Sequence, residues 1–437
     1  PGVCQAVRDF SFCPYRMRLP LVRVTVLAAL LWTAGCTTTP SAPSTTPPAP
    51  HSVVLISVDG LPASALGRGN TPVLDALARD GVRAAWMNPS YPVLTFPNHF
   101  TLVTGLRPDR HGIIHNSMRD ETVGGFKVAD KAAGADARWW QGEPIWNTAG
   151  KAGLRTAVWA WPGNAAPIEG LRPTRWKPYS PEIDSAARAD QVAAWMTEPP
   201  ATRPHLAALY IERVDNVGHE KGPDAPETLA AIREVDAAIG RIVQALDARG
   251  LRASTDIVVV SDHGMAPVQP DQYIAIEDMA TIEQAEAVST GQVIGFNPRA
   301  GHEASTAQRL LGRHDHYECW RKQDLPARWH YGAHPRVPAI VCQFDEGWNA
   351  LPAEQLARTP KDRLNRGSHG YDNALPSMRA VFVAAGPSFR RGATLPAFDN
   401  VDVYPLLAKL LGVTPARNDG SADVFTPVLT PRTAPAH

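Results

Sequence analysis

Uninterrupted apolar runs alternate with amphipathic segments between about residues 51 and 425. The runs share a richness in Val, Ile, Leu and Ala and occupy residues 52–58, 206–211, 257–261 and 380–384. Such runs are typical of parallel strands that helices cover on both faces. Between Glu227 and Arg249, apolar residues recur three or four positions apart, which predicts a helix that ends at Gly250. The alternation predicts an α/β fold with a mainly parallel central sheet flanked by helices.

Three stretches differ in composition and periodicity from the rest of the chain. Residues 267–367 show no strong periodicity and are rich in Trp, Arg and Pro toward their end, so we expect an inserted subdomain beside the functional site. Residues 37–50 are almost entirely Thr, Ser, Pro and Ala, which predicts an extended tether. The Pro- and Thr-rich end, residues 426–437, predicts a disordered tail.

Residues 1–36 have the features of an upstream extension followed by an export signal. Met17 is a plausible start, and basic residues precede the apolar run 24–32, which is too short to span a bilayer comfortably. The run ends in small residues before Cys36, a pattern typical of bacterial lipoprotein signals in which that cysteine becomes lipidated. An ordinary cleaved signal peptide is the alternative. Both predict export, to the periplasm or to a membrane tether of a bacterium.

Composition and charge narrow the classes of function. The chain has 437 residues, and its 43 Lys plus Arg balance its 43 Asp plus Glu. Zero net charge argues against nucleic-acid or acidic-lipid binding through bulk charge. The 44% of hydrophobic residues allows a large core and excludes wholesale disorder. In an oxidising compartment Cys319 and Cys342 can form one disulfide; two buried free thiols are the alternative.

Side chains able to bind metal follow several of the predicted strands. The carboxyl ends of parallel strands meet at one edge of a sheet, where ligands bind. Asp and His together suit a borderline cation such as zinc. Any one of these residues has a simpler explanation, as a helix cap or a structural histidine, but their coincidence at several strand ends favours a metal centre. The residues are Asp59, Asp215, His219, Asp262, His263 and, in a glycine-flanked loop, His369.

A proline-punctuated segment, residues 89–99, is the second chemical signal. Pro97 suits the first turn of a helix that runs to Thr104 and stops at Gly105. Thr95 would then lie at the helix N-terminus, where backbone N–H groups and the helix dipole favour an anion. The alternative is that Thr95 serves only as the N-cap. By contrast, His111 and His115 are interpreted as structural.

Six stretches together resemble the nucleotide pyrophosphatase/phosphodiesterase family within the alkaline phosphatase superfamily. They occur in the family's order and span residues 53–373. The stretches are VVLISVDGL from Val53, YPVLTFPNHFTLVTGLRPDRHGIIHNSM from Tyr91, PIWNTAGKAGLRTAVWAWPG from Pro144, YIERVDNVGHEKGP from Tyr210, VVVSDHGM from Val258 and GSHGYDN from Gly367. The resemblance implies an alkaline phosphatase-like core and two zinc ions per chain.

The resemblance also assigns residues to each ion and to catalysis. The first zinc ion would be held by Asp59, Thr95, Asp262 and His263. The second would be held by Asp215, His219 and His369. Thr95 would be the nucleophile, Asn116 would contact a phosphoryl oxygen, and Phe96 and Tyr179 would sandwich a nucleotide base. His115 departs from the family, which commonly has an acidic residue before this asparagine.

The function so implied is that of an exported two-zinc phosphodiesterase. It would hydrolyse nucleotide diesters or triphosphates to nucleoside monophosphates through a phospho-threonine intermediate. The TFPNH and SDHG segments contain no Arg or Lys, which favours diesters over more highly charged monoesters. The alternatives are a glycerophosphodiester or lysophospholipid-type phosphodiesterase, an alkaline phosphatase-like monoesterase, and a non-catalytic metal-binding lipoprotein. The sequence leaves the oligomeric state open.

Overall fold

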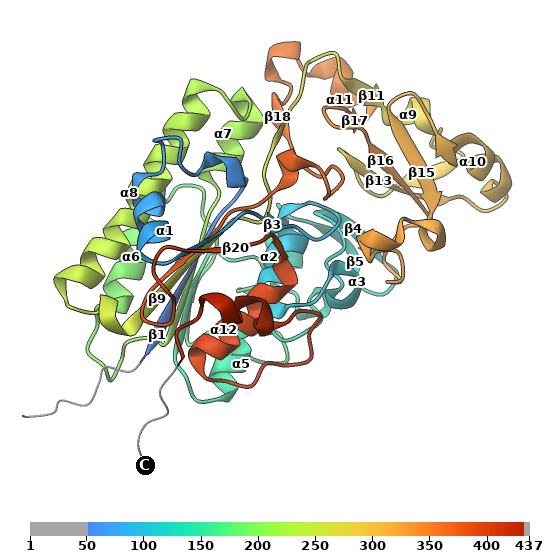
Figure 1. The fold of residues 1–437 in the computed structure, drawn as a ribbon. Helices are drawn as coiled ribbons and strands as arrows, with labels where there is room; N and C mark the ends of the chain where they lie inside the picture. The colour runs from blue at the N-terminus through green and yellow to red at the C-terminus, as the bar shows by residue number, and fades with distance from the viewer. Residues whose placement is uncertain (1–50, 432–437) are drawn as a thin grey trace, which may run out of the picture. The chain divides into compact units, whose positions relative to one another are not determined.

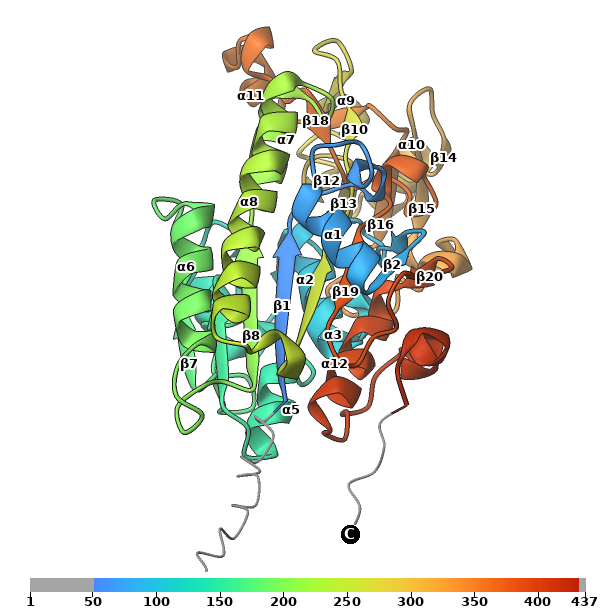
Figure 2. The same ribbon diagram turned by 60° about the vertical axis from the view of Figure 1, so that its left-hand side comes forward.

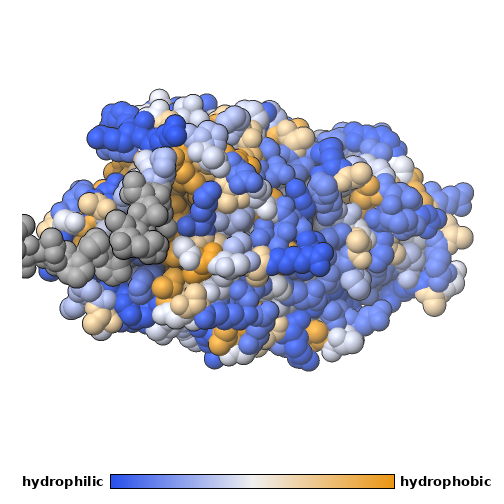
Figure 3. All heavy atoms as spheres, turned by 60° about the horizontal axis from the view of Figure 1, so that its bottom comes forward, coloured by the Kyte–Doolittle hydropathy of each residue, from blue (hydrophilic) through white to orange (hydrophobic). Residues whose placement is uncertain are grey.

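The computed structural model describes residues 51–431. The expected export signal at 1–36, with Cys36, and the tether at 37–50 lie outside this part of the chain. Within it, no helix combines the length and the apolar character that crossing a membrane requires. On the face seen in Figure 3, hydrophobic residues are scattered among hydrophilic ones.

A mixed eight-stranded sheet forms the centre of the fold (Figures 1 and 2). Its middle strand, β1 (Ser52–Val58), pairs in parallel with β8 (Leu206–Ile211) and with β9 (Thr255–Val260). Every residue of these three strands is buried, as their uninterrupted apolar runs predict. The remaining strands are β2 (Val82–Ala84), β6 (Thr156–Trp159), β7 (Arg175–Lys177), β19 (Phe382–Ala385) and β20 (Ala393–Leu395). The predicted α/β class is confirmed.

The direction of β19 differs from the prediction for the 380–384 run. It pairs antiparallel with both β9 and β2, whereas the other neighbouring pairs of the sheet are parallel. The chain reaches β19 from β18 (Gly367–Ser368), which pairs with β10 (Ala266–Pro267) just beyond the end of β9. Because the chain enters β19 from the edge at which β9 ends, the strand runs back through the sheet in the opposite direction.

Helices cover both faces of the sheet. Figure 1 shows α1 (Pro72–Asp80), α6 (Ser185–Met196) and α8 (Pro226–Ala248) on one face. On the other lie α2 (Thr95–Thr104), α5 (Ile145–Lys151) and α12 (Val403–Leu411). The helix predicted between residues 227 and 249 is confirmed as α8, whose apolar stripe is buried.

A second sheet lies within the 267–367 segment and has its own hydrophobic cluster. It consists of β12 (Ala285–Ala287), β13 (Val293–Pro298), β16 (Ile340–Phe344), β15 (Tyr317–Arg321) and β14 (Gly312–Arg313), all antiparallel. Cys319 and Cys342 are register partners on neighbouring strands and are joined by a disulfide. Two short helices accompany the sheet, α9 (Ile276–Met279) and α10 (Glu303–Leu310).

Short elements complete the description. They are β3 (Met87–Asn88), α3 (Pro108–His111), β4 (Ser117–Asp120), β5 (Gly124–Lys127), α4 (Lys131–Ala135), α7 (Arg213–Lys221), β11 (Tyr273–Ala275), β17 (Asn349–Leu351), α11 (Ala353–Arg358) and β21 (Phe398–Asp399).

The fold continues past residue 425, where the sequence suggests the start of a tail. A 3₁₀ helix spans Ala422–Val428, and Phe425 and Val428 are buried in the main core. Thr430 then donates its backbone N–H to the carbonyl oxygen of Ser388. The Pro- and Thr-rich composition does not indicate that these two apolar residues are buried, but they hold the segment against the main core.

Candidate active site

The strand ends bring the predicted metal-binding residues together at one edge of the sheet. Asp59 directly follows β1, and Asp262 and His263 follow β9 after one residue. Asp215 and His219 lie on α7, which begins just after β8, and His369 directly follows β18. All six are buried or largely buried.

Gly60 shows how closely the two strand ends approach. Its φ of +71° is in the left-handed region that favours glycine. A Cβ at this position would lie 3.1 Å from Cα of Asp215, closer than side chains normally pack. The glycine therefore lets Asp59 and Asp215 face the same centre, and its N–H donates to Oδ1 of Asp262 at 3.2 Å.

Ligand-type atoms form two adjacent groups. In the first, Nε2 of His263 lies 3.4 Å from Oδ1 of Asp59 and 3.0 Å from Oδ2 of Asp262. In the second, Oδ1 of Asp215 lies 3.4 Å from Nε2 of His219 and 3.5 Å from Nε2 of His369. Atoms bound about 2.0–2.1 Å from a tetrahedral zinc ion stand about 3.3 Å apart, so both groups have the spacing of ligands.

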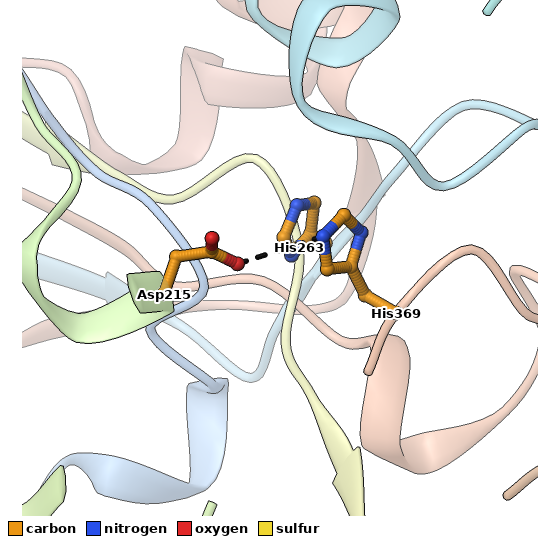
Figure 4. A group of neighbouring side chains, drawn as sticks. All are labelled: Asp215, His263 and His369. Atoms are coloured by element: carbon orange, nitrogen blue, oxygen red, sulfur yellow. Dashed lines mark ion pairs between the residues drawn. The ribbon is translucent and has the colours of Figure 1, made fainter. Parts of the chain in front are cut away.

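The two groups touch through their histidines. The rings of His263 and His369 stack with centroids 3.6 Å apart (Figure 4). Ligand atoms of Asp215, His263 and His369 all lie within 4.8 Å of one another. The arrangement therefore offers room either for two neighbouring cations or for one cation held between the groups.

Backbone carbonyls fix the tautomer of all three histidines. Nδ1 of His219 lies 2.8 Å from the Gly367 carbonyl oxygen, and Nδ1 of His263 lies 2.9 Å from that of Gly264. Nδ1 of His369 lies 2.9 Å from the carbonyl oxygen of Val93. Because a carbonyl oxygen only accepts, each Nδ1 carries the proton and each Nε2 presents a lone pair to the centre. This is the usual arrangement of a metal-binding histidine.

Unpaired buried atoms supply an independent test of the fit to a cation. Within residues 51–431, four side-chain atoms at this centre are buried without a hydrogen-bond partner. They are Oδ1 of Asp59, Oδ1 of Asp215, Oδ2 of Asp262 and Nε2 of His263. Leaving buried acceptors unpaired is costly, and cations satisfy all four at once. The donor set therefore fits zinc.

The pKa values show how burial and neighbouring charges act on the buried carboxylates. Burial, followed by the charges of Asp262 and Asp215, raises the pKa of Asp59 well above its usual value. Burial alone would raise the pKa of Asp262, but the rings of His263 and His99 hold it well below its usual range. Bound cations would favour the charged form of every carboxylate and so lower the pKa that burial raises.

His99 is a residue that sequence reasoning missed. Its ring is fully buried, and Nδ1 donates to the Thr95 carbonyl oxygen at 2.8 Å and lies 3.3 Å from Oδ2 of Asp262. Nε2 accepts from the hydroxyl of Ser57 at 2.8 Å. Both nitrogens are therefore engaged, so His99 supports Thr95 and Asp262 and offers no lone pair to a metal. Only its position four residues after Thr95 on α2 hinted at this contact.

Tyr210 is a second residue that sequence reasoning missed. It is the fifth residue of β8, and its hydroxyl donates to Oδ2 of Asp59 at 2.6 Å across the neighbouring strand. That bond leaves Oδ1 of Asp59 as the oxygen that faces His263. Its place within an apolar strand gave no signal of this role.

Thr95 is the first residue of α2 and Pro97 lies in its first turn, as the sequence predicts. The N-cap position belongs to Leu94, and no side chain caps this helix, so Thr95 is not the N-cap. Oδ1 of Asn116 accepts from the Phe96 N–H at 3.0 Å, which aims the asparagine at the helix start and leaves its Nδ2 donors available. Thr95 and Asn116 line the same cavity as Asp59.

That cavity, which we call the aromatic cavity, has a volume of about 590 Å³ and extends from the ligand groups. Phe96 and Tyr179 both line it, as do Trp161 and Trp176, which the sequence did not single out. Tyr179 is 37% exposed, so its ring is available to a ligand. Aromatic rings facing a cavity beside buried carboxylates and histidines can stack on a planar group while cations bind its phosphate.

The second sheet holds the loop that carries His369. Nε2 of Gln343, on β16, donates to the carbonyl oxygen of Gly370 at 3.2 Å. Nε2 of Gln292 donates to Oγ of Ser368 at 2.5 Å. Residues on both sides of His369 are thus tied to the 267–367 segment, which therefore takes part in positioning a ligand.

Comparisons with known proteins point to one family. A family model described as type I phosphodiesterase/nucleotide pyrophosphatase matches residues 53–372. An uncharacterised pyrophosphatase/phosphodiesterase of Schizosaccharomyces pombe is 34% identical over 390 residues, which cover 86% of this chain and 80% of the yeast protein. Human ectonucleotide pyrophosphatase/phosphodiesterase family member 1 is 33% identical over 405 residues, 89% of this chain but 43% of the human one.

A solved structure with a bound nucleotide is also similar. It is murine ectonucleotide pyrophosphatase/phosphodiesterase 5, in an inactive threonine-to-alanine form in complex with AMP. The TM-score is 0.81 at 31% sequence identity, and the match covers 87% of this chain and 100% of the murine one.

Proposed function

The chain belongs to the type I phosphodiesterase/nucleotide pyrophosphatase family, and from that membership we propose that it is a two-zinc enzyme that hydrolyses nucleotide diesters or triphosphates to nucleoside monophosphates. The observation that carries the proposal is the set of three unpaired buried carboxylate oxygens beside three histidines whose Nε2 lone pairs face them. Such a set is costly in a protein that binds no cation.

We assign the first zinc ion to Asp59, Thr95, Asp262 and His263, and the second to Asp215, His219 and His369. The spacings among the Asp and His ligands support this division. Bound there, the ions would supply the positive charge that stabilises a threonine alkoxide and the departing oxygen. Among residues 51–431, Lys131 at the start of α4 is the one Lys or Arg that lines the aromatic cavity.

The chain's own residues then perform two displacements. Oγ of Thr95 attacks phosphorus, the bond to the leaving oxygen breaks, and a phospho-threonine forms. Water attacks this ester from the opposite side, which releases the nucleoside monophosphate and restores the hydroxyl. Nδ2 of Asn116 donates to a non-bridging phosphoryl oxygen, as its bond to the Phe96 N–H would allow.

The aromatic cavity supports a nucleotide as the retained half. Stacking between Phe96 and Tyr179 contributes about 1–3 kcal/mol per aromatic ring and is tolerant of base identity. The murine relative binds AMP, and its inactive form lacks a threonine, which agrees with a required Thr95 here. A choline head group could also use aromatic rings, so glycerophosphocholine is the informative competitor substrate.

We further propose that the enzyme works outside the cytoplasm. A disulfide between Cys319 and Cys342 suits an oxidising compartment. Relatives named as ectonucleotide enzymes and venom phosphodiesterases point the same way. The mass of the N-terminal peptide of the mature protein tests both export and lipidation of Cys36.

A substrate panel on the zinc-loaded protein tests the activity. We expect ATP and bis-p-nitrophenyl phosphate to be cleaved, and glycerophosphocholine and p-nitrophenyl phosphate to be cleaved far more slowly. Faster cleavage of glycerophosphocholine than of ATP would replace the nucleotide assignment with a lipid-type one. Faster cleavage of the monoester would indicate a phosphatase.

A further inference from the structure

A second and larger cavity adjoins the aromatic cavity. Its volume is about 1030 Å³, and it is lined by the core and by the 267–367 segment; we call it the large cavity. The two cavities share Asn116, His219 and His369. The two cavities therefore meet at the candidate metal centre.

Only two of the candidate metal ligands line the large cavity. Those that line the large cavity, His219 and His369, both belong to the second zinc group. Thr95 lines the aromatic cavity instead. In an in-line displacement the leaving oxygen departs on the side away from the nucleophile. With Thr95 as nucleophile, the leaving group therefore extends past the second zinc group and into the large cavity.

Two cations in the lining have no ion-pair partner within the described chain. Lys127 lies at the end of β5 on the core, and Arg363 lies in the 3₁₀ turn Lys361–Arg363 of the 267–367 segment. Both side chains are exposed. A third cation of the lining, Arg119, is paired with Glu286 at 3.4 Å. Lys127 and Arg363 thus remain available for an anionic ligand.

We propose that the large cavity is the leaving-group subsite, and that Lys127 and Arg363 bind an oligophosphate there. The ligand is the pyrophosphate of a nucleoside triphosphate or the phosphate-bearing half of a dinucleotide. The assignment rests on the proposed function, because it takes Thr95 as the nucleophile. Since this cavity is larger than the aromatic cavity, it has room for a nucleotide-sized leaving group.

The test compares two substrates with the same retained half. Thymidine triphosphate has pyrophosphate as its leaving group, whereas the p-nitrophenyl ester of thymidine monophosphate has p-nitrophenolate, which carries no phosphate. For the variant Lys127→Ala with Arg363→Ala, we expect the ratio of kcat/KM for the triphosphate to that for the ester to fall about tenfold or more. With Arg363→Ala kept, Lys127→Arg in place of Lys127→Ala should restore the ratio in part. Lys361→Ala is the matched control, since it removes a neighbouring exposed cation that does not line the cavity.

Binding gives a second readout that needs no turnover. Calorimetric titration of the zinc-loaded protein should show that the double variant weakens the α,β-methylene analogue of ATP about tenfold more than it weakens AMP. An equal loss for both ligands, or an unchanged ratio for both substrates, overturns the subsite. A wild-type chain that cleaves neither substrate overturns the proposed function instead and removes the premise of the subsite with it.

Discussion

Removal of the His99 ring tests whether the buried layer behind the ligands tunes the metal centre. In His99→Ala, the Thr95 carbonyl oxygen and the Ser57 hydroxyl each lose their imidazole partner, at 2.8 Å in both cases. A buried group left without its hydrogen bond costs about 1–3 kcal/mol, so the two together cost about 2–6 kcal/mol of folding stability. The cavity left by a fully buried ring adds to this cost.

The effect on zinc follows from the contact with Asp262. Without the ring, the carboxylate loses the nitrogen 3.3 Å from its Oδ2. Loss of such a supporting contact weakens metal binding about 10–100-fold. The loss should fall mainly on the first zinc ion, because His99 contacts Thr95 and Asp262, which are both assigned to that ion. His99→Asn is the matched variant, since its amide can still donate to the Thr95 carbonyl oxygen and should recover part of the stability.

Competition with a chromophoric chelator measures the two zinc affinities separately, and urea unfolding measures the stability. The expected pattern is one weakened site, one unchanged site and a lower free energy of unfolding. If His99→Ala binds both ions as tightly as the wild type, the supporting role of the ring is refuted. If both sites weaken equally, the ring has only a general structural role.

Three further predictions concern single residues. Thr95→Ala should lower turnover at least about a thousandfold while circular dichroism stays unchanged; a variant that keeps a few per cent of the activity would remove Thr95 as nucleophile. His369→Ala should bind one zinc ion in elemental analysis, and two would contradict the ligand division. Burial lowers the pKa of His111 from 6.5 to about 3, so the unfolded chain binds the proton first as the pH falls. The free energy of unfolding should therefore fall by about 1.4 kcal/mol per pH unit below 6.5 from this residue alone; His111→Gln should remove that part of the slope in urea titrations, and an unchanged slope would show that His111 is charged in the fold.

The sequence was most informative where a residue's environment depends on near neighbours in the chain. The β1, β8 and β9 runs and the stripe of α8 were predicted because burial repeats with the period of each element. The ends of parallel strands share one edge, which is why Asp59 and Asp262 could be expected to meet.

Features that depend on the path of the chain in space were not predictable in this way. The direction of β19 follows from where the preceding loop lies, which an apolar run does not encode. The five-stranded sheet was missed because some of its strands have only two or three residues, too few to show a period. Tyr210 and His99 look like ordinary core residues until their partners on other elements are known.

The number and position of bound ions tests the central claim most directly. Crystals grown with zinc and AMP should give two anomalous peaks at the zinc edge. One should lie among Asp59, Asp262 and His263 beside Thr95, and the other among Asp215, His219 and His369. A single peak held by Asp215, His263 and His369, whose ligand atoms already lie within 4.8 Å of one another, would contradict the two-zinc account.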